Sequence, residues 1–286
     1  MKRWTEKDVR SAVEESINLR QAILKLKAAD NQTSYKNIRG FIQKYQIPVS
    51  HFVPGPVRGP ARLTNWITPE RVGGSNFWYV IGLIATDGNL SPDNKTVDIT
   101  STNKEFLDKI KEVCKITTKI LPKNKANSHA WALRTYHKEF YESLKTLGLM
   151  QRKSHILGTL TIPDNFFHDF FRGVVDGDGS LVSWLGPDSD ANTQWKMKIS
   201  SASIAFATWL RASMQRIFGV KGSIQSYCSE GKTIQYDLSY GRSESSRIAK
   251  KCYYPEATLF LERKFNKAMQ LIDDEFASTR EETPHG

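Results

Sequence analysis

Two stretches of the chain follow nearly the same order of apolar and small residues, 91 positions apart. The first, 80–88, is VIGLIATDG and the second, 171–179, is FRGVVDGDG, so both end in Asp-Gly. Aromatic residues precede each stretch, and a polar residue and a leucine follow it. An internal repeat predicts architecture as well as a site. We therefore expect two similar subdomains that face each other, each bringing one carboxylate, Asp87 or Asp178, to a shared centre.

Small residues at the third and seventh positions of each repeat predict two helices packed against each other. Residues four apart share one face of a helix, and small side chains let two backbones approach closely. The glycines that follow Asp87 and Asp178 are suited to ending a helix. The two carboxylates are then expected side by side at the helix ends. The small residues are Gly82 and Thr86 in the first copy and Gly173 and Gly177 in the second.

Two neighbouring carboxylates repel each other unless a cation neutralises them or one of them takes up a proton. Oxygen ligands without histidine or cysteine favour a hard divalent cation such as magnesium. A calcium loop that starts at Asp176 is excluded, because its sixth and twelfth positions would be Leu181 and Pro187. A simple turn explains a single Asp-Gly but not two copies with matched flanks.

The segments after each repeat have strand and helix patterns in the same order. In the first half we expect strands over 96–100, 116–123 and 130–136, and helices over 104–115 and 138–147. In the second half we expect strands over 181–185, 194–200, 222–228 and 233–240, and helices over 203–218 and 242–252. The subdomains are assigned to 71–160 and 161–276, followed by a flexible polar tail at 277–286.

The first 52 residues predict a small all-α domain. One helix begins near Thr5, a second covers 19–27, and Thr33 or Ser34 caps a third that ends before Pro48. Two short helices, a polar turn and a basic third helix are similar to the helix-turn-helix modules of phage and bacterial endonucleases, in which the third helix enters the major groove. A three-helix cap that stabilises the protein or binds another protein is the alternative. The candidate DNA contacts are Lys36, Asn37, Arg39, Gln43 and Lys44.

A linker at 53–70 separates this domain from the repeats, and its proline, glycine and arginine content predicts a stiff, extended segment. Arg58 and Arg62 are expected to run along a phosphate backbone, and a plain spacer between two domains is the alternative. Up to residue 62 the chain has 12 Lys and Arg against 5 acidic residues. This end is therefore more basic than the rest.

The charge of the whole chain points to a polyanionic partner. Its 286 residues include 41 Lys and Arg against 30 Asp and Glu, a net charge of +11, and nucleic acid is the usual partner of such a surplus. The cysteines Cys114, Cys228 and Cys252 lie far apart, which argues against a zinc site or a disulfide framework and favours a reducing compartment. Without a signal peptide or a long apolar stretch, we expect an intracellular protein, cytoplasmic or nucleoid-associated and of bacterial or phage origin.

The doubled motif resembles the LAGLIDADG homing endonucleases, over roughly residues 71–270, and two copies in one chain are typical of the single-chain, pseudo-symmetric members. In that family the eighth position of the motif holds the metal-binding acid, which is Asp87 in one copy and Asp178 in the other. The first copy departs at the sixth position, where Ala85 replaces the acid that Asp176 retains. The resemblance implies an α/β (α+β) fold of two αββαββα subdomains that form a saddle of antiparallel sheets.

The resemblance also implies a function and a site. The expected activity is a site-specific double-strand DNA endonuclease that acts as a monomer on a long, asymmetric site and leaves 3′ overhangs. Its expected cofactor is Mg²⁺, with Mn²⁺ or Ca²⁺ as substitutes, held by Asp87 and Asp178 with the backbone carbonyls of Thr86 and Gly177. An Arg-Lys pair closes each half, which makes Lys153 and Lys264 the candidate catalytic lysines near the scissile phosphate.

Strands that alternate apolar with basic or hydroxyl residues predict a DNA-contacting face on each sheet. Each candidate contact could equally be ordinary surface. The candidates are Lys95, Thr100, Lys119, Lys123, Lys125, Arg134, Ser183, Lys196, Lys198, Gln225, Ser226 and Gln235.

Two other functions fit the same scaffold. An RNA maturase that assists intron splicing would keep the basic saddle with intron RNA as its partner, and a non-catalytic DNA-binding regulator would have a decayed endonuclease core. The retention of both eighth-position acids argues against decay. Intein splicing lacks support, because the splice-junction residues are missing.

Overall fold

The protein is described from a computed structural model. It describes residues 4–16, 19–29, 31–49, 52, 67–123, 129–186, 193–228 and 233–281. The chain divides into two compact units, residues 1–62 and 63–286, and each is considered by itself. None of the helices in these ranges is both long and apolar enough to cross a membrane.

The first unit consists of short helices around a small apolar core. The described helices are α1 (Glu6–Glu14), α2 (Leu19–Lys25) and α3 (Gln32–Lys44). The side chain of Thr5 caps α1 and Asp8 returns the bond, so both partners of a capping box are present. The cap of α3 is Asn31, whose side chain accepts a hydrogen bond from the Ser34 amide, and the expected cap at Thr33 or Ser34 was wrong by two or three positions. The buried core comprises Val9, Val13, Ala22, Ile23, Ile38 and Ile47.

The second unit contains two copies of one α+β arrangement. The first copy comprises α4 (Pro69–Val72), α5 (Gly74–Thr86), β1 (Gly88–Leu90), β2 (Thr96–Ser101), α6 (Lys104–Val113), β3 (Leu121–Pro122), β4 (Trp131–Tyr136) and α7 (Lys138–Thr146). The second comprises α8 (Phe167–Asp178), β5 (Gly179–Leu185), β6 (Thr193–Ser201), α9 (Ile204–Phe218), β7 (Ser223–Tyr227), β8 (Gln235–Tyr240), α10 (Arg242–Cys252) and α11 (Glu262–Glu281). Two short 3₁₀ turns, η2 (Lys153–His155) and η3 (Asp164–Phe166), lie between the copies.

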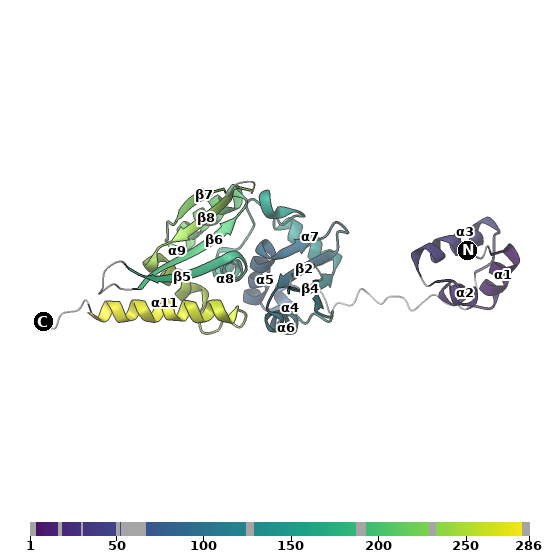
Figure 1. The fold of residues 1–286 in the computed structure, drawn as a ribbon, viewed down its shortest axis with the longest axis horizontal. Helices are drawn as coiled ribbons and strands as arrows, with labels where there is room; N and C mark the ends of the chain where they lie inside the picture. The colour runs from purple at the N-terminus through teal and green to yellow at the C-terminus, as the bar shows by residue number, and fades with distance from the viewer. Residues whose placement is uncertain are drawn as a thin grey trace. The chain divides into compact units, whose positions relative to one another are not determined.

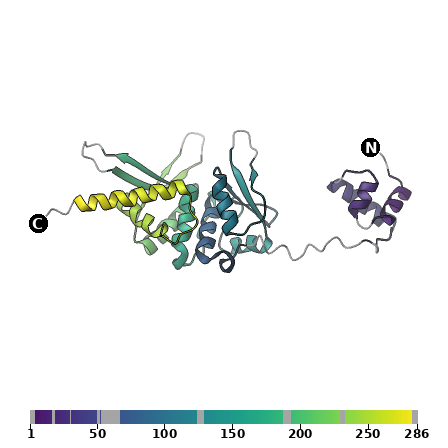
Figure 2. The ribbon, with the colours of Figure 1, turned by 90° about the horizontal axis from the view of Figure 1, so that it is seen from below.

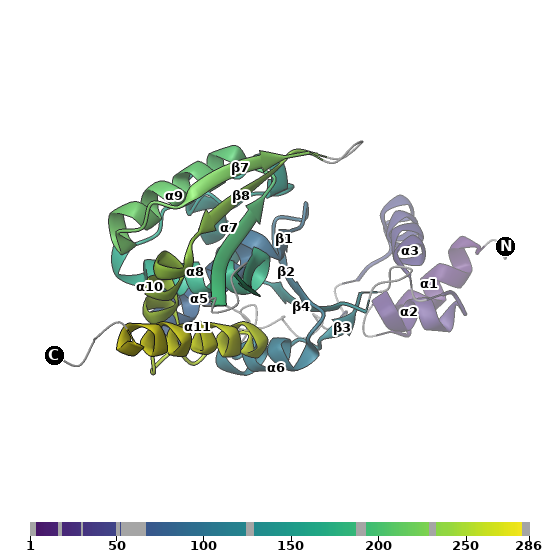
Figure 3. The same cartoon turned by 60° about the vertical axis from the view of Figure 1, so that its left-hand side comes forward.

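The sheets of the two copies have the same topology. The described strands form antiparallel four-stranded sheets of order β1-β2-β4-β3 and β5-β6-β8-β7. Figure 2 places the strands of both sheets toward the same side of the central helices, and Figure 3 shows α9 along the second sheet. The predicted fold class is thereby confirmed, and the arrangement is consistent with a pseudo-symmetric saddle.

Three segments differ from the sequence-based expectation. The strand expected over 116–123 is reduced to Leu121–Pro122, and the short strand Gly88–Leu90 was not expected. The chain also ends in a helix, α11, which extends to Glu281 and so includes the first five residues of the expected flexible tail. Packing against the second sheet and α10 accounts for this helix, because its buried residues Ala268 and Leu271 belong to the core.

Helices α5 and α8 pack side by side at the centre of the second unit (Figure 1). A Cβ atom added to Gly82 would overlap the Phe170 carbonyl oxygen, and one added to Gly173 would overlap that of Tyr79. One turn further on, a Cβ atom at Gly177 would overlap the Thr86 side chain. The predicted small-residue faces therefore meet as expected, with the helix backbones in direct contact.

One continuous hydrophobic core runs through both copies, from Ile67 to Leu271. It contains apolar residues of α5 and α8 together with residues from both sheets and from α6, α7, α9, α10 and α11. Because the halves share this core, the ends of α5 and α8 are held at a fixed position relative to each other.

Candidate metal and nucleic-acid site

The two repeat aspartates lie where the central helices end. Asp87 is the C-terminal cap of α5 and Asp178 is the last residue of α8, and both side chains are exposed. The glycine after each has no positive φ, contrary to the expected helix-stopping role. A Cβ atom at Gly88 would instead lie 2.5 Å from the Ile84 Cα atom. These glycines are required because the chain turns closely over its own helix as it enters the strand.

The two carboxyl groups lose hydration at the helix ends, and the pKa of each is raised. Loss of hydration in the surrounding protein, and then the Asp87 carboxylate, raise the pKa of Asp178 to about 6. Loss of hydration also raises the pKa of Asp87, against the opposing effect of Lys264 and Lys153. Both carboxylates are accessible to solvent but poorly hydrated, so their negative charge is unfavourable. A proton or a bound cation would relieve this by neutralising the charge.

A buried lysine lies behind each helix end. The Lys153 side chain is 7% exposed, and its Nζ donates to the carbonyl oxygens of Thr86 (3.1 Å) and Gly88 (2.5 Å). Burial lowers the pKa of Lys153, while Asp178 and Asp87 raise it. A cation at a helix C-terminus is favourable because the last carbonyl groups there have no intrahelical donor.

The second lysine occupies the corresponding place on α8. Lys264 is 3% exposed, and its Nζ donates to the carbonyl oxygens of Val175 (2.6 Å), Asp176 (2.8 Å) and Gly177 (3.0 Å). Burial lowers the pKa of Lys264 to about 8, against the attraction of Asp176. The four residues singled out as catalytic from the sequence therefore surround one place in the structure.

The donor atoms around the pair fit a hard divalent cation. The carboxylates of Asp87 and Asp178 and the carbonyls of Thr86 and Gly177 are all oxygen ligands. Each of the two carbonyls accepts one hydrogen bond from a lysine, and a carbonyl oxygen has a second lone pair. Within the described residues no group of three or more His, Cys, Asp or Glu side chains could hold a metal.

The sixth-position acid of the second repeat has a structural role. Asp176 is 3% exposed and accepts hydrogen bonds from the Tyr79 hydroxyl (2.7 Å), the Tyr253 hydroxyl (2.9 Å) and the Leu261 amide (2.7 Å). Burial raises the pKa of Asp176. The carboxylate joins α8 to α5 and to the segment before α11. The equivalent position in the first repeat, Ala85, makes no such connection.

In the first sheet, the structure uses several candidate DNA contacts internally. Arg134 forms an ion pair with the buried carboxylate of Asp98, with N···O distances of 2.5 and 3.1 Å, directly across from it in the strand register. Lys123 donates to the Thr100 hydroxyl at 2.9 Å. The side chains of Lys95 and Lys119 are exposed. Lys125 lies outside the described residues.

In the second sheet, strand alternation separates the candidates onto opposite faces. Lys196, Lys198, Gln225 and Gln235 share one face, where Lys198 is paired with Asp237 at 2.9 Å. Ser183 lies opposite the buried Trp195 in the strand register. Ser226 lies two residues after Ile224, which packs against the core, and so shares its face of the strand. These two serines point to the helix-covered face, because neighbouring strand residues alternate sides. Both side chains are exposed, and their contact with DNA stays a prediction.

Large apolar side chains on the same open face were missed from the sequence. Val182, Trp184 and Tyr227 are 42%, 47% and 46% exposed. Val182 is paired with Lys196 and Tyr227 with Gln235 in the strand register. The sequence contains a signal for them, because residues on a strand alternate between its two faces. Val182 and Trp184 alternate with the buried Leu181, and Lys196 and Lys198 alternate with the buried Met197. An open strand face with exposed aromatic and basic residues is suited to base edges and thymine methyl groups.

In the first unit, the basic residues of α3 lie on its solvent side. Lys36, Asn37, Arg39 and Lys44 are exposed, whereas Ile38 is fully buried. A continuous polar surface on a short helix is compatible with a recognition helix. The linker residues Arg58 and Arg62 lie outside the described residues.

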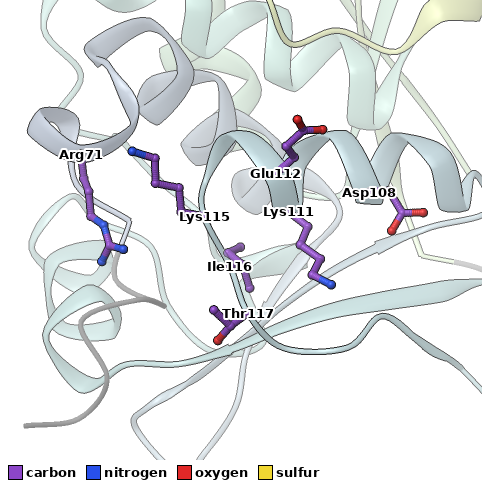
Figure 4. A pocket seen from close by; sticks show the side chains of 7 residues that line it. All are labelled: Arg71, Asp108, Lys111, Glu112, Lys115, Ile116 and Thr117. Carbon is purple, nitrogen blue, oxygen red and sulfur yellow. The ribbon is translucent and has the colours of Figure 1, made fainter.

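A hollow of about 490 Å³ lies at the C-terminal end of α6 (Figure 4). Acidic and basic side chains of α6 surround it together with Arg71, and none of the residues predicted for the site is among them. The candidate site is therefore defined by the helix ends and not by this hollow.

These observations define a class of protein: an α+β protein with two motif helices packed at a pseudo-symmetric centre and one carboxylate at the end of each. Residues 75–148 match the family model of the LAGLIDADG-like domain. This part of the chain is similar to the LAGLIDADG-like domain, in agreement with the resemblance inferred from the doubled motif. The match covers the first repeat and its sheet.

Similar solved structures include the DNA-bound LAGLIDADG homing endonucleases I-LtrWI and I-GzeII. The first is 14% identical, with 72% of this chain and 92% of that chain covered and a TM-score of 0.47. The second is 13% identical, with 77% and 94% covered and a TM-score of 0.47. Full-length DUF199/WhiA from Thermatoga maritima is 12% identical, covers 78% of this chain and has a TM-score of 0.46. The chain spans 66% of that protein's length. No curated protein matches the sequence.

Proposed function

We propose that the protein is a site-specific, divalent-metal-dependent endonuclease that cuts both strands of a long, asymmetric DNA site and leaves 3′ overhangs. The observation that carries this proposal is the meeting of Asp87 and Asp178 at the ends of α5 and α8, with Lys153 and Lys264 buried behind them. Such a centre offers anionic ligands for a cation and cationic groups for a phosphate at one place.

In the proposed mechanism the protein's own groups hold and orient the reacting phosphates. Asp87 and Asp178 would hold the cation, with the carbonyls of Thr86 and Gly177 as further oxygen ligands. A divalent ion held there would supply Lewis-acid stabilisation and a more acidic water. Lys153 and Lys264 place positive charge where the phosphate gains negative charge in the transition state. Because the acids lie on one pseudo-two-fold axis, the cuts on the two strands should fall close together.

The DNA-binding surface proposed here combines the open sheet faces with the first unit. Lys196, Lys198 and Gln225 would contact DNA from the second sheet, next to Trp184 and Tyr227. In the first sheet Arg134 is committed to Asp98, so Lys95 and Lys119 are the freer cations for phosphate contacts. Helix α3 would add a second, separate contact through Lys36 and Arg39 as a helix-turn-helix module.

The test is incubation of the protein with a randomised duplex library and Mg²⁺, followed by sequencing of the cut ends. We expect one enriched site with 3′ extensions for the wild type, and no cutting for Asp87→Asn or Asp178→Asn. Each variant removes a direct cation ligand, so either substitution alone should abolish cleavage. Asp273→Asn, an exposed aspartate on α11, is the matched control and should cut normally.

Other outcomes of the same experiment favour the alternative functions. Enrichment of bound but uncut duplexes would indicate a DNA-binding regulator. Tight binding of structured RNA without any cut DNA would indicate a maturase. Cleavage that persists in both Asp→Asn variants would contradict the assignment of the aspartate pair as the metal site.

A further inference from the structure

A cavity of about 320 Å³ lies beside Asp178 and is formed by both halves of the second unit. Lys153 and His155 of η2 line it from one side, and Ser200 and Gln235 of the second sheet line it from the other. Lys153, His155 and Gln235 each have an N–H group able to donate a further hydrogen bond, whereas the Ser200 hydroxyl already donates to Asp237 at 2.7 Å. Their chemistry suits the oxygens of a phosphate group.

The segment that carries His155 is held on both sides. Two residues before it, Lys153 is bonded to the end of α5 through Thr86 and Gly88. Two residues after it, the Leu157 carbonyl accepts a hydrogen bond from the Ser203 hydroxyl at 2.6 Å, and Ser203 is the N-cap of α9. The Leu157 amide also donates to the Lys153 carbonyl at 2.8 Å. His155 therefore has a fixed backbone position next to the cavity while its side chain stays exposed.

The other half of the centre lacks an equivalent imidazole. Two residues after Lys264 is Asn266, and the residue between them, Phe265, stacks on Phe260 with ring centroids 4.4 Å apart. The surroundings of the two acids are thus chemically different.

We propose that the His155 imidazole is a further contact to the phosphate of one DNA strand, the strand cut on the Asp178 side. The inference rests on the proposed function, because it names a residue of that same site. Its consequence is that the two strands are cut by unequal sets of groups. Loss of His155 should slow one strand and leave the other nearly unchanged.

The first test measures the two strands separately, on the duplex recovered from the library with a different dye on each strand. A hydrogen bond to a charged phosphate is typically worth a factor of about 10 to 100, so His155→Ala should slow the cutting of one strand by that factor and produce nicked duplex. Asn266→Ala, at the equivalent position after Lys264, is the control and should cut both strands at the wild-type rate. Equal slowing of both strands by His155→Ala, or no slowing, would overturn the proposal.

The second test requires no cleavage and separates this proposal from the proposed function. The imidazole resonances of His155 are followed by NMR as a random-sequence duplex is added in EDTA, with the exposed His129 as the reference. We expect a saturable shift of His155 that is larger than that of His129 and reduced by salt. A shift of His155 in EDTA, together with no cutting of the library in Mg²⁺, would retain the phosphate contact and reject the endonuclease. An unchanged His155 resonance on a protein that binds the duplex would reject the contact.

Discussion

The carboxyl group of Asp178 makes the metal-free protein sensitive to pH. Its pKa is raised to about 6 from 3.8, so the folded protein retains a proton on this group at pH values where the unfolded chain has lost it. Below about pH 4 the group is protonated in both states and does not affect the free energy of unfolding. As the pH rises, ionising Asp178 costs more free energy in the folded state than in the unfolded chain, and this destabilisation is fully developed above about pH 6. In EDTA, Asp178→Asn should melt at a higher temperature than the wild type at about pH 7.5, and the difference should vanish near pH 4.

Thermal unfolding of the wild type and the variant across this range checks the expectation, with Asp273→Asn as a control of equal charge change. Mg²⁺ should raise the melting temperature of the wild type above about pH 6 and leave that of Asp178→Asn unchanged, since the cation then replaces the proton. A constant difference between the variant and the wild type at all pH values would show that Asp178 is not the titrating group.

Lys264 stabilises the end of α8 by satisfying three backbone carbonyl groups with one ammonium. Lys264→Met would leave these acceptors without a donor, and we expect a loss of about 1–3 kcal/mol in the free energy of unfolding. The control is Lys267→Met in the same helix. That lysine is exposed and donates to a single carbonyl, Leu181, at 3.1 Å, so its loss should cost less than about 0.5 kcal/mol. Urea unfolding at neutral pH measures both values, and equal losses would reject the capping role.

At the residue scale, the sequence identified the residues of the centre but not the roles that depend on distant partners. Asp87, Asp178, Lys153 and Lys264 could be found because the repeat and its closing Arg-Lys pairs mark them locally. Asp176 could not be assigned, because its donors come from positions 79, 253 and 261. His155 has no motif of its own, and only the fold brings it next to Asp178.

The central helix pair depends on the absence of side chains at two positions. In Gly82→Ala the new methyl group would meet the Phe170 carbonyl oxygen and lie 2.9 Å from the Val174 amide nitrogen, which are backbone atoms and cannot turn aside. Alanine gains up to about 1 kcal/mol in helix propensity over glycine, but separating two packed backbones costs about 1–3 kcal/mol or more. We expect a net loss of stability in urea unfolding and a larger loss of cleavage, because the two aspartates move apart.

Gly158→Ala is the matched control for this substitution. Its added methyl group has no neighbour within 4 Å, and the backbone there has no positive φ. It should unfold within about 0.5 kcal/mol of the wild type. A Gly82→Ala protein as stable and active as this control would show that the contact between α5 and α8 tolerates expansion.

At the element scale, pattern reasoning succeeded where one periodicity extended over a whole segment. The repeat helices, β2, β4 and the four strands of the second sheet were expected close to their observed bounds. It failed where pairing partners decide the outcome: β1 is three residues long and exists because it pairs with β2. The face of each strand residue could not be predicted without the register, which places Ser183 and Ser226 opposite to Lys196 and Gln225. The final helix was missed because its apolar positions, such as Leu271, are spaced among many charged residues.

At the scale of the whole molecule, the two halves of the second unit are alike in topology and unlike in chemistry. The sheets have the same strand order, yet Asp176 has Ala85 as its counterpart, and His155 has Asn266. A single chain permits this divergence, because each copy can change without the other. An asymmetric centre of this kind is suited to an asymmetric DNA site, in which the two strands present different surroundings to the two acids.

The first unit has a core of its own, and this leads to a prediction for residues 63–286 alone. The core of the second unit runs from Ile67 onward, and among the described residues none of the first unit belongs to it. We expect the shortened protein to unfold in one cooperative transition and to cut the library-derived site. If Lys36, Arg39 and Lys44 each contact a phosphate, the shortened protein should bind the DNA site more weakly than the full chain. The magnitude of the slope of log binding constant against log salt concentration should be smaller by about 3. Lys7→Gln, an exposed change on α1 in the full chain, is the control and should alter neither value. Unchanged affinity and salt slope after removal of residues 1–62 would identify the first unit as something other than a DNA-binding module.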